Sequence, residues 1–84
     1  MKFLAVSQNL GDPTPWLAAE SAQMAQLVQR GVVHDMYVKT DYSGAVLIMD
    51  AADQPDAEKE LATLPLVNAQ LTRFALTAIL EPPR

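Results

Sequence analysis

The stretch VVHDMYVKTDYSGAVLIMDA, residues 32–51, decides the fold of this chain. Residues 32–40 are rich in β-branched and aromatic side chains, which is typical of a β-strand, and residues 45–51 are predicted to form the next strand. Between them, the residues DYSG at 41–44 favour a tight turn, because aspartate, serine and glycine accept the backbone conformations that turns need. The middle of the chain is therefore predicted to be a β-hairpin.

One strand and one helix are predicted before the hairpin. Residues 2–8 begin as an apolar run that is typical of a strand. Residues 15–30 are predicted to form a helix, with Thr14 as its N-cap and Pro15 at its first position. Gly31 follows directly and is a typical helix stop.

A second helix and a last strand are predicted after the hairpin. Asp53 or Gln54 is expected to cap a helix that begins near Pro55 and ends at Pro65. Residues 71–81 are predicted to form the final strand. The order βαββαβ predicts the ferredoxin-like α+β fold, in which a four-stranded antiparallel sheet carries two helices on one face. A single domain over residues 1–84 is expected.

The predicted strands are apolar on both of their faces. In the first strand, Phe3 and Ala5 point to one side of the sheet, and Leu4 and Val6 point to the other. A face that met water would instead alternate between apolar and polar residues. Because the helices cover only one face, we expect the other face to pack against the same sheet of a second copy. The sequence thus predicts a homodimeric α+β barrel and leaves further assembly open.

Composition narrows the class of protein. Half of the 84 residues are hydrophobic and 19% are charged, which is typical of a globular domain. The net charge of −4 argues against a nucleic-acid partner. No apolar run approaches the roughly 20 residues that cross a bilayer, and the apolar N-terminal run ends at Ser7, too early for a signal peptide. We therefore expect a cytoplasmic protein without a membrane partner.

Glu20 is the most unusual residue of the predicted first helix. It lies within an apolar stripe that consists of Leu17, Met24, Leu27 and Val28. A buried carboxylate is costly unless it is paired or neutralised, so its pKa should be raised, which suits proton transfer near neutral pH. Alternatively, Glu20 lies at the edge of the stripe and reaches into water.

The only histidine, His34, lies in the predicted second strand. Strict alternation places Val32, His34, Met36 and Val38 on the side beneath the helices. His34 would then share a layer with Glu20, either as an acid–base pair across a small pocket or as a hydrogen-bonded structural pair.

Four further residues are candidates for binding a small-molecule substrate. Met24 and Tyr37 are expected to line its pocket, although methionines of this kind are most simply core residues. Trp16 is expected either to cover the mouth of the pocket or to pack against the edge of the sheet. Arg73 binds a substrate carboxylate or forms a salt bridge. One histidine, no cysteine and three glycines offer no metal site and no phosphate loop, so no cofactor is expected.

Two stretches resemble the muconolactone delta-isomerase family. One runs from Glu20 through AQLVQRG at residues 25–31, and the other is LATLPL at residues 61–66. The resemblance covers residues 20–66, with no gaps between the two stretches. It implies a dimeric α+β barrel and a cofactor-free isomerase, in which Glu20 occupies the place of the proton-transfer residue.

The second strand departs from that family. This chain has VHDMY at residues 33–37, where the sequence of the family is similar to WRHLW. Of the aromatic residues that this strand contributes to the family's pocket, only Tyr37 remains. We therefore expect a small cyclic or polyketide-like carbonyl compound as substrate, not muconolactone itself. In the favoured interpretation, Glu20 moves a proton and His34 polarises an oxygen. Two alternatives remain: a non-catalytic small-molecule-binding or structural barrel, and a cofactor-independent monooxygenase of the antibiotic-biosynthesis type.

Overall fold

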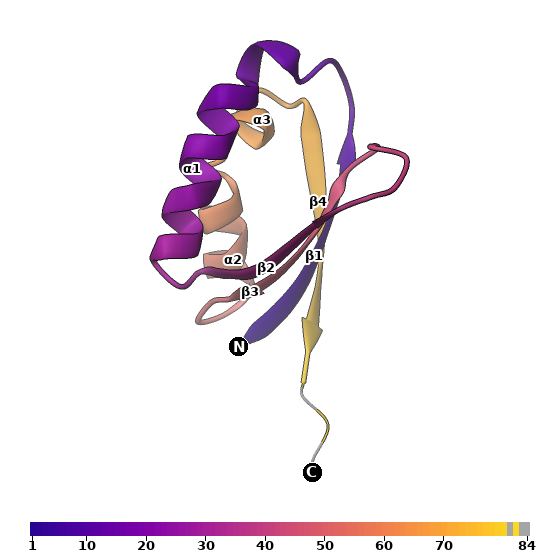
Figure 1. Ribbon diagram of the computed structural model, residues 1–84. Helices are drawn as coiled ribbons and strands as arrows, with labels where there is room; N and C mark the ends of the chain where they lie inside the picture. The colour runs from indigo at the N-terminus through magenta and orange to yellow at the C-terminus, as the bar shows by residue number, and fades with distance from the viewer. Residues whose placement is uncertain (81, 83–84) are drawn as a thin grey trace.

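A four-stranded antiparallel sheet carries the helices of the described residues on one face (Figure 1). The computed structural model describes residues 1–80 and 82, so residue 81, the predicted end of the last strand, lies outside the described residues. The sheet has the order β2-β3-β1-β4. Its elements are β1 (Lys2–Asn9), η1 (Thr14–Trp16), α1 (Leu17–Gln29), β2 (Val33–Val38), β3 (Ala45–Asp50), α2 (Gln54–Leu61), α3 (Pro65–Asn68) and β4 (Thr72–Ile79). The predicted ferredoxin-like α+β fold is confirmed.

The start of the first helix differs from the prediction. Thr14 caps nothing with its side chain, because its backbone N–H and its hydroxyl both donate to Asp12 Oδ1, at 3.0 and 2.6 Å. A short 3-10 turn follows, and α1 begins at Leu17. The end of the helix is as predicted, because Gly31 has a φ of 75°, the left-handed conformation that glycine adopts without strain.

The second helix begins as predicted and is followed by an unforeseen one. The Asp53 carboxylate caps α2 by accepting the backbone N–H of Asp56 at 2.9 Å. Pro65 was predicted to end this helix, but it starts the short helix α3 instead, at the position where a missing N–H costs nothing. The chain thus carries a third helix near the start of α1 (Figure 1).

The strand β2 breaks strict alternation near its beginning. Val33 pairs with Met49, whereas Asp35 pairs with Ile48, so the register shifts between Val33 and Asp35. This irregularity inserts His34 as an extra residue. As a result Val33, predicted on the open side of the sheet, is buried in the core beside Met49.

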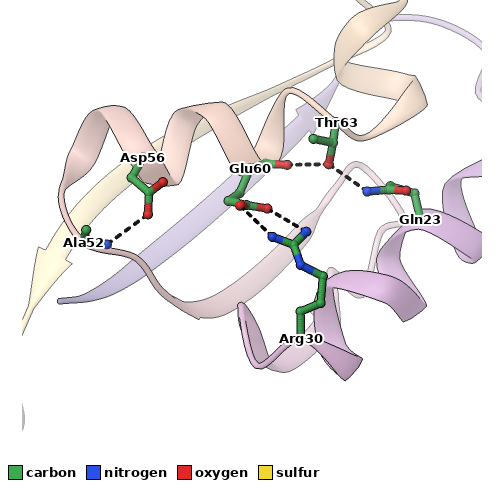
Figure 2. A network of polar contacts seen from close by, with 6 residues as sticks. All are labelled: Gln23, Arg30, Ala52, Asp56, Glu60 and Thr63. Atoms are coloured by element: carbon green, nitrogen blue, oxygen red, sulfur yellow. Dashed lines mark hydrogen bonds and ion pairs between the residues drawn. The ribbon is translucent and has the colours of Figure 1, made fainter.

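The core fills one end of the layer between helices and sheet, which we call the closed end. Its fully buried large side chains include Phe3, Leu27, Leu47, Met49 and Leu64. Over this end, Arg30 forms two hydrogen bonds with the Glu60 carboxylate, at 2.9 and 3.1 Å, and so links the end of α1 to α2 (Figure 2). Gln23 adds a second link by donating to the Thr63 hydroxyl at 2.9 Å.

The other face of the sheet has no helix over it (Figure 1). Alternation along β1 and β3 directs Leu4, Val6, Val46 and Ile48 to this side, and all four are partly exposed. We call it the open face. Among the described residues, no helix is long and apolar enough to cross a membrane.

Candidate functional site

A cavity of about 540 Å³ occupies the other end of the helix-to-sheet layer, which we call the open end. One stripe of α1 forms one wall, and the ends of all four strands form the opposite wall. The apolar lining residues are Pro13, Leu17, Met24, Ala25, Val28, Met36, Val38, Ala45, Leu66 and Phe74. A volume of this size suits a small organic ligand.

Small residues keep this end open. Ser7, Gly44 and Ala45 meet where β1 ends and β3 begins. A Cβ atom built on Gly44 would lie 1.9 Å from the Ser7 carbonyl oxygen, so only glycine permits this close approach. The Ser7 hydroxyl fixes the same contact by accepting the Ala45 N–H at 2.8 Å. The hairpin is thereby held against β1, and the cavity floor is lined by backbone and small side chains.

Among the described residues, Glu20 is the only charged one that lines the cavity. Its side chain is half-buried, and Oε1 accepts the backbone N–H of Leu66 at 3.0 Å. Burial raises the pKa of the Glu20 carboxyl above its ordinary value, against the lowering effect of the bond from Leu66. A carboxyl group with a raised pKa beside an apolar cavity is a candidate for acid–base chemistry.

The bond to Leu66 also has a structural role. Leu66 is the second residue of α3, and its N–H has no acceptor within that helix. Glu20 therefore ties the start of α3 to α1 through one of its two oxygens. Oε2 takes no part in this bond and is available to a ligand or a proton.

The other polar groups of the cavity are largely occupied by the fold. Asn9 donates to the Tyr42 carbonyl at 3.2 Å, and the Thr72 hydroxyl donates to the Gln8 carbonyl at 3.1 Å. Ser21, the residue after Glu20, lines the cavity, and no hydrogen bond of its hydroxyl is recorded within residues 1–80 and 82. Glu20 and Ser21 are thus the two adjacent groups of α1 best placed to meet a ligand.

Of the predicted substrate-binding residues, the structure brings only Met24 to the cavity of Glu20. Trp16 lies in the turn before α1, is 41% exposed and does not line the cavity. Tyr37 points to the open face of the sheet, where it pairs with Val46 and is 63% exposed. Arg73 lines a separate cavity of about 330 Å³ at the outer edge of β4.

The expected placement of His34 beside Glu20 is wrong. The irregularity in β2 moves His34 out of the alternating pattern, and the residue does not line the cavity. Its Nε2 instead pairs with the carboxylate of Asp50 in β3, with both side chains about half exposed. Asp50 follows the buried Met49 and therefore points to the open face. The geometry leaves Glu20 without a histidine partner in the cavity.

Several residues that line the cavity were not predicted from the sequence. Tyr42 belongs to the hairpin turn and has a φ of 60°, and Ser21 shares the helix turn of Glu20. A helical projection places Ser21 next to Val28, at the edge of the apolar stripe, so this residue was within reach of the sequence. Tyr42, Asn9 and Thr72 come together only through the register of the sheet. Thr72 and Phe74 line both cavities and separate them.

The described part of the chain holds no group of three histidine, cysteine, aspartate or glutamate side chains that could bind a metal ion.

Comparison with known proteins bears on the fold. No family model and no curated protein matches the sequence. Among solved structures, the chain is similar to 5-chloro-2-hydroxyhydroquinone dehydrochlorinase (TftG) from Burkholderia phenoliruptrix AC1100, in complex with 2,5-dihydroxybenzoquinone. The TM-score is 0.80 at 18% identity, over 98% of this chain and 96% of the other. The chain therefore has the fold of the dimeric α+β barrels.

Proposed function

We propose that this protein is a cofactor-free, isomerase-like enzyme that transfers a proton on a small lactone or enolisable carbonyl compound. The observation that carries the proposal is the half-buried Glu20 carboxyl, with its raised pKa, on the wall of a largely apolar cavity of about 540 Å³. The resemblance of residues 20–66 to the muconolactone delta-isomerase family, in which Glu20 takes the place of the proton-transfer residue, supports the same role.

In the proposed reaction, the Glu20 carboxylate takes a proton from the carbon next to the carbonyl group. The electrons of that C–H bond move onto the carbonyl oxygen and form an enolate. The protonated Glu20 then returns the proton to another carbon of the conjugated system, and the double bond shifts. Ser21, which lines the same cavity, would donate a hydrogen bond to the enolate oxygen.

The test is hydrogen exchange and isomerisation in heavy water with a panel of lactones and enols. Glu20→Gln keeps the volume of the side chain and the acceptor for Leu66 but cannot take a proton. Activity should fall by roughly 10² to 10⁴, the usual contribution of an acid–base group. Glu58→Gln, a matched change outside this cavity, should leave it unaffected. Equal activity of the wild type and Glu20→Gln would contradict the proposed role.

A second candidate is a non-catalytic small-molecule-binding barrel, and the bond from Leu66 to Glu20 favours it. In that case Glu20 is retained because it satisfies the start of α3. The panel would then bind to the protein without exchange of hydrogen in either variant. A monooxygenase of the antibiotic-biosynthesis type would instead consume oxygen with its substrate, which an oxygen electrode detects.

We propose that the protein is a homodimer in which the open faces of two sheets pack together. The support is the apolar character of that face, where Leu4, Val6, Val46 and Ile48 are only partly covered in one chain. Ala75 pairs with Val6 on the same face, so Ala75→Asp should split the dimer. Ala22→Asp on the exposed side of α1 is the control. Sedimentation of the wild type as a monomer at micromolar concentration would contradict the proposal.

A further inference from the structure

The charges around the cavity restrict its ligand. Within residues 1–80 and 82, its lining contains one acidic residue, Glu20, and no lysine, arginine or histidine. Asp12 and Asp41 directly precede the lining residues Pro13 and Tyr42, and both are exposed. Hydrogen bonds from Thr14 and Ser43 hold the pKa of Asp12 and of Asp41, respectively, below the ordinary value. Asp12 and Asp41 thus favour the ionised form, each next in sequence to a lining residue, and the cavity itself carries the carboxyl group of Glu20.

The basic residues of the chain lie elsewhere. Arg30 is paired with Glu60 over the closed end, and Arg73 lines the other cavity. Lys39 precedes the hairpin turn and acts on Asp41 without lining the cavity. Lys2 lies in β1, Lys59 lies in α2, and Arg84 is outside the described residues. In the described chain, no cation is placed to balance an anionic ligand at Glu20.

Apart from the hydroxyl of Tyr42 in the hairpin turn, the free polar side chains of the cavity lie on α1. Glu20 Oε2 and the Ser21 hydroxyl are neighbours on α1, whereas the side chains of Ser7, Asn9 and Thr72 bond within the fold. The remaining wall is mostly aliphatic, with Phe74 and the two methionines Met24 and Met36. Such a wall favours the binding of apolar ligand surface, and it offers no partner to an additional charged group of the ligand.

We infer that the cavity takes an uncharged, largely apolar small molecule with one carbonyl or hydroxyl group near Glu20 and Ser21, and that it rejects carboxylates and ammonium compounds. This inference rests on the proposed function and narrows its substrate class. A carboxylate would meet the repulsion of Glu20, and no lysine, arginine or histidine among the described residues lines the cavity to compensate it. An ammonium group would have to give up its water shell among aliphatic side chains, with a single carboxyl group as partner.

The experiment compares three probes of one skeleton: methyl phenylacetate, which is neutral and enolisable, phenylacetate and phenethylamine. Binding to the full-length, isotope-labelled protein is followed near neutral pH through the backbone amide signals. The Leu66 amide reports on Glu20, and the Ala45 amide reports on the opposite wall. We expect the ester to shift both signals and to bind roughly 10-fold or more tighter than phenylacetate, as expected for like charges at an effective dielectric constant of about 20. Phenethylamine should bind more weakly than the ester as well.

Two variants separate charge from shape. Glu20→Gln removes the interior charge, so the preference for the ester over phenylacetate should shrink. Glu58→Gln changes the net charge equally but lies outside this cavity, so the preference should persist.

The outcomes distinguish this inference from the proposed function. If phenylacetate or phenethylamine binds as tightly as the ester through the same amides, the inference is overturned while the cavity remains a ligand site. If no probe shifts the amides of the lining residues, both the inference and the proposed function are overturned. A preference for the ester that is lost in Glu58→Gln and kept in Glu20→Gln would also overturn the inference.

Discussion

The two ends of the helix-to-sheet layer are built from the same elements and differ in how they are filled. At the closed end, large side chains such as Leu27, Met49 and Leu64 are fully buried, and the bond between Arg30 and Glu60 holds α1 to α2. At the open end, the same helix α1 faces small residues and backbone at the ends of the strands, and a cavity remains. One helix thus contributes Leu27 to the buried core and Arg30, its C-cap, to the link with α2, while its residues from Leu17 to Val28 line the candidate site.

The first pair of variants tests whether side chains at the closed end contribute more to the free energy of unfolding than side chains at the open end. Leu64 is 0% exposed, so Leu64→Ala should reduce the free energy of unfolding by about 2–5 kcal/mol through lost burial and a new void. Leu17, at the open end, is 49% exposed, and Leu17→Ala should cost less than about 1 kcal/mol. Urea unfolding of both variants measures the difference. Equal losses would show that the two ends do not divide stability in this way.

A second pair of variants tests the close approach that shapes the open end. Gly44→Ala would place a methyl group against the Ser7 carbonyl and should cost about 2–3 kcal/mol, because backbone atoms would have to move. Gly31→Ala meets no atom within 4 Å, and only its φ of 75° is unfavourable. That change should cost about 1–2 kcal/mol. Thermal unfolding ranks the two, and the reverse order would contradict the contact between hairpin and β1.

The raised pKa of Glu20 predicts how the stability of the protein depends on pH. Its pKa in the folded state is raised above the ordinary value of 4.5, so the folded protein binds this proton more tightly than the unfolded chain does. The contribution of Glu20 to stability is therefore present below pH 4.5 and is lost as pH rises through the raised pKa. The stability of Glu20→Gln relative to wild type should increase over that range. A difference independent of pH would mean that the carboxyl titrates normally.

The smallest effect concerns the link over the closed end. Arg30 and Glu60 form two parallel hydrogen bonds, but 53% of the Arg30 side chain is exposed. A double-mutant cycle with Arg30→Gln and Glu60→Gln should give a coupling energy of about 0.2–1 kcal/mol that weakens in salt. A much larger coupling energy would mean that this ion pair, and not the buried core, is the main source of stability at the closed end.

Much of the architecture was accessible from the sequence, because periodicity and turn residues report on local structure. The hairpin, the Gly31 stop and the ferredoxin-like order were predicted and found, and the cap of α2 is Asp53, one of the two predicted candidates. The stripe of α1 that carries Glu20 does face the layer between helix and sheet. These features depend on residues close together in the chain.

The remainder of the site depends on register. Alternation placed His34 beneath the helices, but one extra residue in β2 put it elsewhere, and nothing in the local sequence marks that irregularity. Pairing across the sheet likewise decides that Tyr42 lines the cavity of Glu20 and that Tyr37 does not. Arg73 was assigned by its chemistry alone, and it lies at a second cavity because β4 is an edge strand.

The wall between the two cavities has a consequence for motion. Phe74 has open space on both sides, whereas Phe3, the other phenylalanine of the chain, is enclosed by the core. An aromatic ring turns about its axis only when its neighbours make room, so the Phe74 ring should turn faster than that of Phe3. A molecule that enters the cavity of Glu20 removes the space on one side. The rate of Phe74 ring flips, measured from its aromatic NMR signals, should therefore fall when a molecule occupies that cavity.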